Sequence, residues 1–241
     1  MLNVSNLTKK FDGKVAVGGV SFVIKPGEIF SLIGPNSSGK TTIVKTIAGL
    51  LRPNTGTVTV GEHDVVLKPL ETKSLIGYIP DEPVVWSGMT GEEFLHFVGA
   101  LYGLAESTRT QKITELLAVF ALSGLEKEYF ENYSRGNKQK FTILAALLHE
   151  PKLLLVDEPI VGLDPESAII AKTLFTQFAK AGGAVLLVTH TLTVAEEIAT
   201  RVGVLKEGKL LGTGTLPELR AQAKLGTSAT LDQVYAALTA L

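Results

Sequence analysis

The sequence predicts an α/β protein with a mostly parallel sheet, an N-terminal antiparallel β part and an inserted helical part. Short apolar runs of strand length, such as residues 29–32 and 153–156, alternate with segments of helical periodicity. Between these two runs, from Thr90 to His149, the apolar residues recur at helical spacing. We expect one domain with these units: an α/β core at 1–80 and 150–214, a helical unit at 81–149 and C-terminal helices at 215–241.

Composition excludes several classes of protein. The chain has 241 residues, of which 45% are hydrophobic and 20% charged, as in ordinary globular proteins. A net charge of −1 gives no basic footprint, so we expect no nucleic-acid partner. The lack of cysteine excludes a disulfide framework and a thiolate zinc site. The N-terminus lacks the apolar stretch of a signal peptide, and no apolar run approaches the roughly 20 residues of a spanning helix. We expect a cytoplasmic protein.

The strands of the N-terminal third are bounded by turn signals. Turns are expected at Asp12-Gly13 and at Pro26-Gly27. We expect strands at 2–7, 20–24, 29–32, 57–60 and 75–79, the first three forming an antiparallel lead-in.

Helix signals follow in the rest of the chain. Amphipathic runs predict helices at 109–122 and 165–180, and apolar runs predict a strand at 184–189 and a hairpin at 202–211. Four capping boxes are expected, at Thr90/Glu93, Thr193/Glu196, Thr215/Glu218 and Thr230/Gln233.

The segment GPNSSGKTT is the strongest chemical signal in the sequence. It follows the apolar strand 28–33 and begins a helix, and it matches the P-loop, in which successive backbone N–H groups surround the phosphates of a nucleotide. Lys40 is expected to reach the β and γ phosphates, and Thr41 to offer its hydroxyl to Mg²⁺. The residues assigned to nucleotide binding in this segment are Gly34, Pro35, Asn36, Ser37, Ser38, Gly39, Lys40, Thr41 and Thr42.

A second strand, LLLVDEP, delivers two carboxylates at its C-terminal end, where open parallel sheets bind ligands. We expect Asp157 to hold Mg²⁺ and Glu158 to polarise the water that attacks the γ phosphate. An acidic pair after a strand is more often a solvated turn when it stands alone. The P-loop in the same chain favours the functional interpretation.

Two weaker signals complete the set. In YSRGN, Ser134 and Gly136 would place a hydroxyl and backbone N–H groups at a helix N-terminus, as an anion site or as a simple helix cap. His190 follows the strand 184–189 and is positioned either to contact the γ phosphate or to be structural.

The ordered motifs GPNSSGKTT, YSRGN, LLLVDEP, GLDP and VTH resemble those of the ATP-binding subunit of an ABC transporter, over essentially the whole chain. The resemblance implies a P-loop NTPase core that uses ATP and Mg²⁺. It also implies that two subunits, identical or different, meet head to tail around two ATP molecules and drive a separate transmembrane permease from the inner face of the membrane.

The same resemblance assigns roles to particular residues. Lys40, Glu158 and His190 would be catalytic, and Phe11 would stack on adenine. Asp164 of GLDP would communicate across the dimer. The residues that would face the opposing ATP are Ser134, Arg135, Gly136 and Asn137.

Three departures from the family pattern stand out. Asp81 occupies the position where the family usually has a glutamine that senses Mg²⁺ and couples to the membrane subunit, so we assign Asp81 to metal binding and coupling. Arg135 replaces a glycine of the signature, and Asn137 replaces its glutamine. The acid at 81 and the YSxG-type signature are similar to the branch that energises drug, antibiotic-resistance or polysaccharide exporters, so export is expected.

Two alternatives remain open. The chain could be a soluble ATPase of the same type that acts in translation or DNA repair, although it shows one cassette and no sustained heptads. It could also be a regulatory subunit that barely hydrolyses ATP, which the Asp81 and Asn137 departures leave possible.

Overall fold

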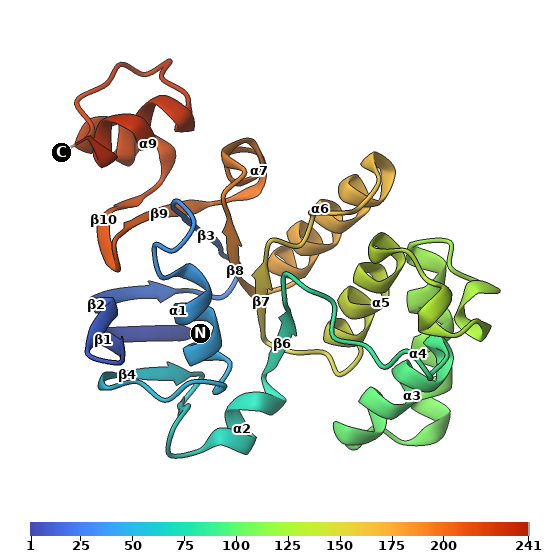
Figure 1. The fold of residues 1–241 in the computed structure, drawn as a ribbon. Coiled ribbons are helices and arrows are strands. Elements are labelled where there is room, and N and C mark those ends of the chain that lie inside the picture. The colour runs from blue at the N-terminus through green and yellow to red at the C-terminus, as the bar shows by residue number, and fades with distance from the viewer. Residues whose placement is uncertain (241) are drawn as a thin grey trace.

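The computed structural model describes residues 1–240 and contains two β-sheets (Figure 1). The larger sheet has six strands in the order β10-β9-β3-β8-β7-β6, and only β10 runs antiparallel to its neighbour. Its strands are β3 (Ile29–Ile33), β6 (Ile76–Ile79), β7 (Leu153–Asp157), β8 (Ala184–Thr189), β9 (Arg201–Lys206) and β10 (Lys209–Gly214). Every residue of β3, β7 and β8 is buried, as their continuous apolar sequences require. The predicted mostly parallel sheet is confirmed.

The smaller sheet is antiparallel, with the order β2-β1-β4-β5. Its strands are β1 (Leu2–Phe11), β2 (Lys14–Ile24), β4 (Thr55–Val60) and β5 (His63–Asp64). Asp12 and Gly13 both have positive φ, which joins β1 and β2 as a tight hairpin. The prediction that the first three strands form one antiparallel unit is wrong for the third strand. The strand at 29–32 pairs in parallel with β8 and β9 in the larger sheet, and β4 takes the third place beside β1.

Helix α1 (Lys40–Ile47) lies between the two sheets. Its buried residues Ile43, Val44 and Ile47 follow helical spacing and pack in one core with side chains from both sheets. Because α1 begins directly after the loop that follows β3, this packing fixes the P-loop at the carboxyl end of the parallel sheet.

The helical part consists of α3 (Gly91–Leu101), α4 (Glu106–Val119) and α5 (Arg135–Leu147), with two short 3₁₀ turns between α4 and α5. These helices pack on the face of the larger sheet that is opposite to α1, and side chains from both form a second hydrophobic core. Side chains of a strand alternate between faces, so Leu155 packs in the core of α1 whereas Leu154 and Val156 pack in the core of α5 and α6 (Pro165–Lys180). The predicted helix at 109–122 is displaced toward the N-terminus, to 106–119.

The remaining helices pack on the larger sheet, some against its central strands β3 and β8 and others at its edges. They are α2 (Pro69–Ser74), α6 (Pro165–Lys180), α7 (Leu192–Ile198), α8 (Leu216–Gln222) and α9 (Leu231–Thr239). Helix α2 was not predicted, because six residues are too few to show helical periodicity. No helix in the described residues is both long and apolar enough to cross a membrane.

Three of the four predicted capping boxes are confirmed, at Thr90, Thr215 and Thr230. The box at Thr193/Glu196 is wrong. Helix α7 begins two residues earlier than that box requires, and the Glu196 carboxylate accepts a hydrogen bond from the backbone N–H of Leu231 at 3.1 Å. Glu196 therefore ties α7 to the start of α9, a contact between distant segments that the local pattern could not show.

Candidate functional site

The loop between β3 and α1 is shaped by its glycines. A Cβ at Gly34 would lie 2.2 Å from the carbonyl oxygen of Leu205, and a Cβ at Gly39 would lie 2.7 Å from that of Ala16. Gly39 also has φ +107, a conformation that side chains disfavour. The loop therefore needs glycine at both positions to bend toward α1 and to present its N–H groups.

Lys40, the first residue of α1, points back over this loop. Its buried ammonium donates hydrogen bonds to the carbonyl oxygens of Gly34 at 2.8 Å and Pro35 at 2.9 Å. Burial lowers the pKa of Lys40, while the carboxylates of Glu158 and Asp157 act in the opposite direction. A positive charge held beside a glycine-containing loop at the start of a helix is a site for an anion such as a phosphate.

Asp157 ends β7 beside the same loop and is only 2% exposed. Burial raises the pKa of Asp157 to about 6, and the Glu158 and Asp81 carboxylates add to this shift. A hydrogen bond with Thr41 acts against it. A buried carboxylate with a raised pKa gains stability from a cation, and Asp157 and Thr41 together provide the one or two protein oxygens that Mg²⁺ usually takes beside substrate phosphates.

Glu158 follows with a positive φ of 49, which is uncommon for a residue that carries a side chain. Its carboxylate accepts hydrogen bonds from the Thr189 hydroxyl at 3.0 Å and from the His190 backbone N–H at 2.8 Å. The His190 Nδ1 atom lies 2.6 Å from the same carboxylate. Glu158 and His190, which come from two adjacent strand ends, thus form one acid–imidazole unit.

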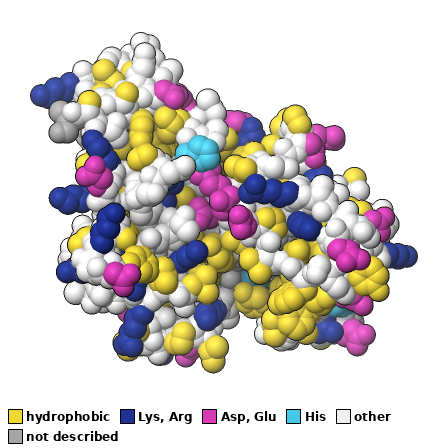
Figure 2. Space-filling model, viewed as in Figure 1, with side chains coloured by type: hydrophobic (Ala, Val, Ile, Leu, Met, Phe, Trp, Pro, Cys, Tyr) yellow, Lys and Arg dark blue, Asp and Glu magenta, His cyan; other side chains and the backbone are white. Residues whose placement is uncertain are grey.

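These groups converge on a single polar cavity of about 470 Å³. Figure 2 shows acidic side chains gathered on this face of the molecule, between α1 and the helical part. The cavity brings together two stretches of the P-loop, both carboxylates and His190. It is lined by Ala16, Asn36, Ser37, Gly39, Lys40, Thr41, Thr42, Asp81, Glu82, Arg135, Asp157, Glu158, Val161 and His190.

Phe11 lines a neighbouring cavity that shares Ala16 and Ser37 with the polar one. The Phe11 ring is 42% exposed, and the Lys9 ammonium lies 5.1 Å from its centre. An exposed aromatic face beside a phosphate site suits the stacking of a nucleobase.

Glu207 lines this second cavity and was not singled out in the sequence. It belongs to the β9–β10 turn, which is fixed against the P-loop by a 2.9 Å hydrogen bond from the Gly208 N–H to the Ser38 carbonyl. The hairpin that contains this turn was predicted. Its contact with the P-loop could not be predicted, because the two segments are far apart in the sequence.

Of the four signature residues, Arg135 lines the polar cavity and the other three do not. The Ser134 hydroxyl caps α5 by accepting a hydrogen bond from the Asn137 N–H at 3.2 Å, as predicted for a capped helix. A Cβ at Gly136 would lie 2.6 Å from the Gly162 carbonyl oxygen, so glycine allows α5 to approach the GLDP loop.

Asp164 occupies the N-cap of α6. Its carboxylate accepts hydrogen bonds from the Ser167 N–H at 2.9 Å and the Ser167 hydroxyl at 2.7 Å, and it lies 3.1 Å from the Lys140 ammonium. These contacts hold the pKa of Asp164 well below its usual range. Within one chain, Asp164 is a helix cap that also connects α6 to α5.

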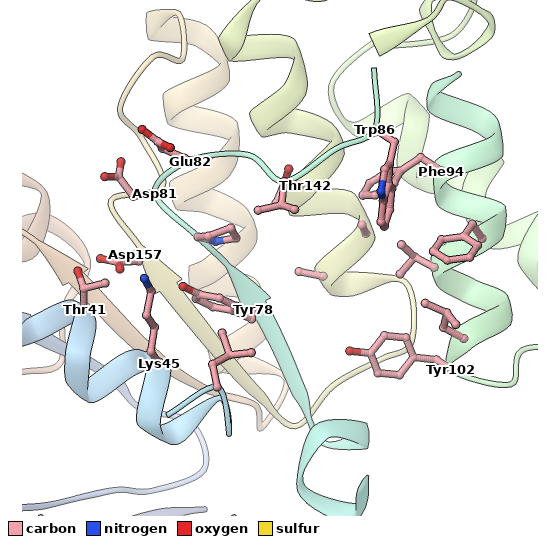
Figure 3. Close-up of a pocket in the computed structure, with 18 residues that line it drawn as sticks. Thr41, Lys45, Tyr78, Asp81, Glu82, Trp86, Phe94, Tyr102, Thr142 and Asp157 are labelled. Carbon is pink, nitrogen blue, oxygen red and sulfur yellow. The ribbon is translucent and has the colours of Figure 1, made fainter. Parts of the chain in front are cut away.

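An apolar groove of about 710 Å³ adjoins the polar cavity, and the sequence did not predict it (Figure 3). Of the apolar residues on α3, Phe94 is buried, whereas Phe97 and Leu101 remain 41% and 69% exposed. Trp86, half exposed, packs edge-on against Phe97 with ring centres 5.4 Å apart. The helical spacing of these residues predicts a helix with an apolar face, and part of that face is open.

The fold and the polar cavity define a P-loop nucleotide-binding protein. Residues 17–161 match the family model described as ABC transporter. The chain is 34% identical to the linearmycin resistance ATP-binding protein LnrL of Bacillus subtilis (strain 168) over 219 residues, which cover 91% of this chain and 70% of that protein.

Solved structures with the same fold support this family match. An ATP-binding subunit of an ABC transporter superposes with a TM-score of 0.95 at 33% identity, covering 99% of both chains. The dimeric ATP-binding cassette MJ0796, in a post-hydrolysis state with ADP and Pi, superposes with a TM-score of 0.81 at 25% identity, covering 90% of this chain and 99% of that one. The chain belongs to the ABC transporter family and is an ATP-binding subunit with ATPase activity.

Proposed function

We propose that the polar cavity around Lys40 is where this subunit hydrolyses ATP. The observation that carries the proposal is the convergence of the P-loop, two carboxylates and a histidine on one cavity. Lys40 and the loop N–H groups would hold the β and γ phosphates, and Phe11 would stack on adenine. Thr41 and Asp157 would hold Mg²⁺, with Asp81 close by. When bound, Mg²⁺ neutralises charge on the phosphates.

In this proposal Glu158 acts as the base that orients and polarises the attacking water. Its carboxylate is already oriented by Thr189 and by the backbone of His190, so it needs little reorganisation. The His190 ring, whose Nδ1 contacts Glu158, is placed to help hold the water or the γ phosphate.

We further propose that ATP joins two such subunits head to tail. The solved post-hydrolysis state of MJ0796 is dimeric, and this chain shares its fold. Ser134, Gly136 and Asn137 do not line the chain's own cavity, so they remain available to an ATP on a partner subunit. Asp164, in the GLDP loop, would lie near the contact between the two subunits.

The apolar groove is the proposed docking site of a transmembrane permease. Its exposed aromatic residues Trp86 and Phe97 offer an apolar surface for a helix, and Asp81 and Glu82 place negative charge at one end. The partner segment would therefore be an amphipathic helix with a basic residue near that end.

The name of the linearmycin resistance relative supports export, with the subunit at the inner face of the membrane. We propose that the chain is one ATPase domain made of the units 1–80 with 150–214, 81–149 and 215–241.

The test is affinity purification of tagged Glu158→Gln protein with ATP from detergent-solubilised native membranes. We expect a stoichiometric polytopic membrane protein to co-purify. Recovery of ribosomal or DNA-bound partners without a membrane protein would instead support a soluble ATPase of the same family.

The proposed dimer is tested separately by light scattering. Addition of Mg²⁺ and ATP to the purified Glu158→Gln chain should double its mass, and the additional change Lys40→Ala should prevent this. A mass that stays that of one chain at saturating ATP would exclude a homodimer.

A further inference from the structure

Two of the departures from the family pattern lie in contact. Arg135, at the start of α5, and Asp81, after β6, are 54 positions apart in the sequence. One guanidinium nitrogen of Arg135 lies 3.4 Å from both the Asp81 carboxylate and the Asp81 backbone carbonyl oxygen. An arginine and an acid thus meet where the family usually has a glycine and a glutamine.

The Arg135 side chain is also held along its length. Its Cδ and Cγ atoms lie 3.4 and 3.6 Å from where a Cβ on Gly162 would be, so the aliphatic part lies on the backbone of the GLDP loop. Gly162 has φ +85 and carries no side chain that would displace the arginine. Arg135 therefore bridges α5, the GLDP loop and the segment after β6.

The position of this pair gives it a chemical consequence. Asp81 and Arg135 both line the polar cavity that holds Lys40, and Asp81 also lines the apolar groove. A nucleotide in the cavity brings phosphate charge that attracts the guanidinium. A cation beside Asp157 attracts the Asp81 carboxylate. A nucleotide with its bound cation would therefore compete for both members of the pair, the phosphates for Arg135 and the cation for Asp81.

We infer that Arg135 serves its own subunit as a positioning residue: in the nucleotide-free chain it pairs with Asp81 and holds α5 against the edge of the sheet, and nucleotide binding separates the two. This rests on the proposed ATP site at Lys40. Both side chains are 52% exposed, and exposed ion pairs change an equilibrium by only up to about fivefold. The pair is thus weak enough for a bound nucleotide to displace.

The first test is a double-mutant cycle on nucleotide affinity. A fluorescent ATP analogue is titrated without Mg²⁺ into the full chain and into Asp81→Asn, Arg135→Gln and the double variant. Because Asp81 competes with the nucleotide for Arg135, Asp81→Asn should tighten binding about two- to fivefold more when Arg135 is present than in the Arg135→Gln background. Equal effects in both backgrounds would overturn the inference.

Glu82 provides a matched control, because it is a neighbouring acid that lines the same cavity and has no ion pair within the described residues. Glu82→Gln removes a negative charge and should change affinity by the same factor with or without Arg135. If Lys40→Ala still binds the analogue normally, the proposed site itself is wrong. If Lys40→Ala loses binding and the cycle is additive, only the Arg135–Asp81 inference is wrong.

The second test needs no nucleotide. Hydrogen exchange is measured on the nucleotide-free chain in the peptides that contain the start of α5 and the GLDP loop. Asp81→Asn and Arg135→Gln should each speed exchange there, the double variant should be no faster than either, and Arg135→Lys should keep most of the protection. Exchange unchanged by Asp81→Asn would show that the pair does not hold α5.

Discussion

The polar cavity and the apolar groove lie side by side and share Thr41, Asp81, Glu82 and Asp157, yet they are built in opposite ways. In the cavity, Lys40 and Glu158 are already held by specific hydrogen bonds within the chain. In the groove, large apolar side chains such as Phe97 stay exposed. The groups of the cavity are held in place by contacts within the chain, whereas the large apolar side chains of the groove remain open to a partner.

The largest effect is expected inside the cavity. Glu158→Gln keeps the shape of the side chain but removes the base, so kcat for ATP hydrolysis should fall by about 100-fold or more. Binding of ATP should remain. Glu166→Gln, at an exposed position in the first turn of α6, is the control and should leave kcat unchanged. Rapid turnover by Glu158→Gln would remove the assigned role of this carboxylate.

The next effect concerns the buried charge of Asp157, which lines both regions. The pKa of Asp157 is raised on folding from 3.8 to about 6, so its buried charge lowers stability as pH rises through this range, and above the range the loss is complete and constant. Asp157→Asn should therefore increase the free energy of unfolding of the nucleotide-free chain by about 2 kcal/mol at pH 8. Near pH 4 the two proteins should be almost equal in urea denaturation. An equal increase in the free energy of unfolding at both pH values would show that the buried charge of Asp157 is not its cause.

A charge placed in the groove should affect partner binding but not the cavity. Phe97→Glu is expected to reduce co-purification of the membrane partner about tenfold, because it puts a carboxylate in an apolar contact. ATP affinity should stay within about twofold. Ile169→Glu, which changes a 60% exposed residue on α6, is the matched control and should leave both unaffected. Loss of ATP binding in Phe97→Glu would mean that the two regions are not separable in this way.

The smallest effect concerns the helix that carries one wall of the groove. Thr90 caps α3 in a reciprocal box with Glu93, so Thr90→Ala should lower the free energy of unfolding by about 1 kcal/mol. The urea midpoint, at an unchanged slope, reports this loss. Thr114→Ala, within α4, removes a hydroxyl that bonds only within its own helix and should change little.

The polar cavity was more predictable from the sequence than the groove for a physical reason. Lys40 and Glu158 are constrained by the residues next to them, because the bend of the P-loop and the end of β7 are local features. The cap at Thr90 is local too. Such constraints leave a pattern within a few residues, and these predictions agree with the fold.

What the sequence did not show arises from contacts between distant segments. Trp86 and Phe97 line the groove only because the helical part packs beside β6, and the contact between Arg135 and Asp81 joins positions 54 residues apart. The false capping box at Glu196 has the same cause, since its carboxylate is used by the start of α9. A periodic apolar pattern says that a helix has an apolar face, but not what covers it.

The most direct test of the central claim is equilibrium binding of ATP to purified wild-type, Lys40→Ala and Glu158→Gln chains, with analysis of the bound nucleotide. If the polar cavity is the site of hydrolysis, Lys40→Ala should bind no measurable ATP and Glu158→Gln should retain unhydrolysed ATP. Wild-type protein should convert bound ATP to ADP. Normal ATP binding by Lys40→Ala, or ADP formed at the wild-type rate by Glu158→Gln, would contradict the account.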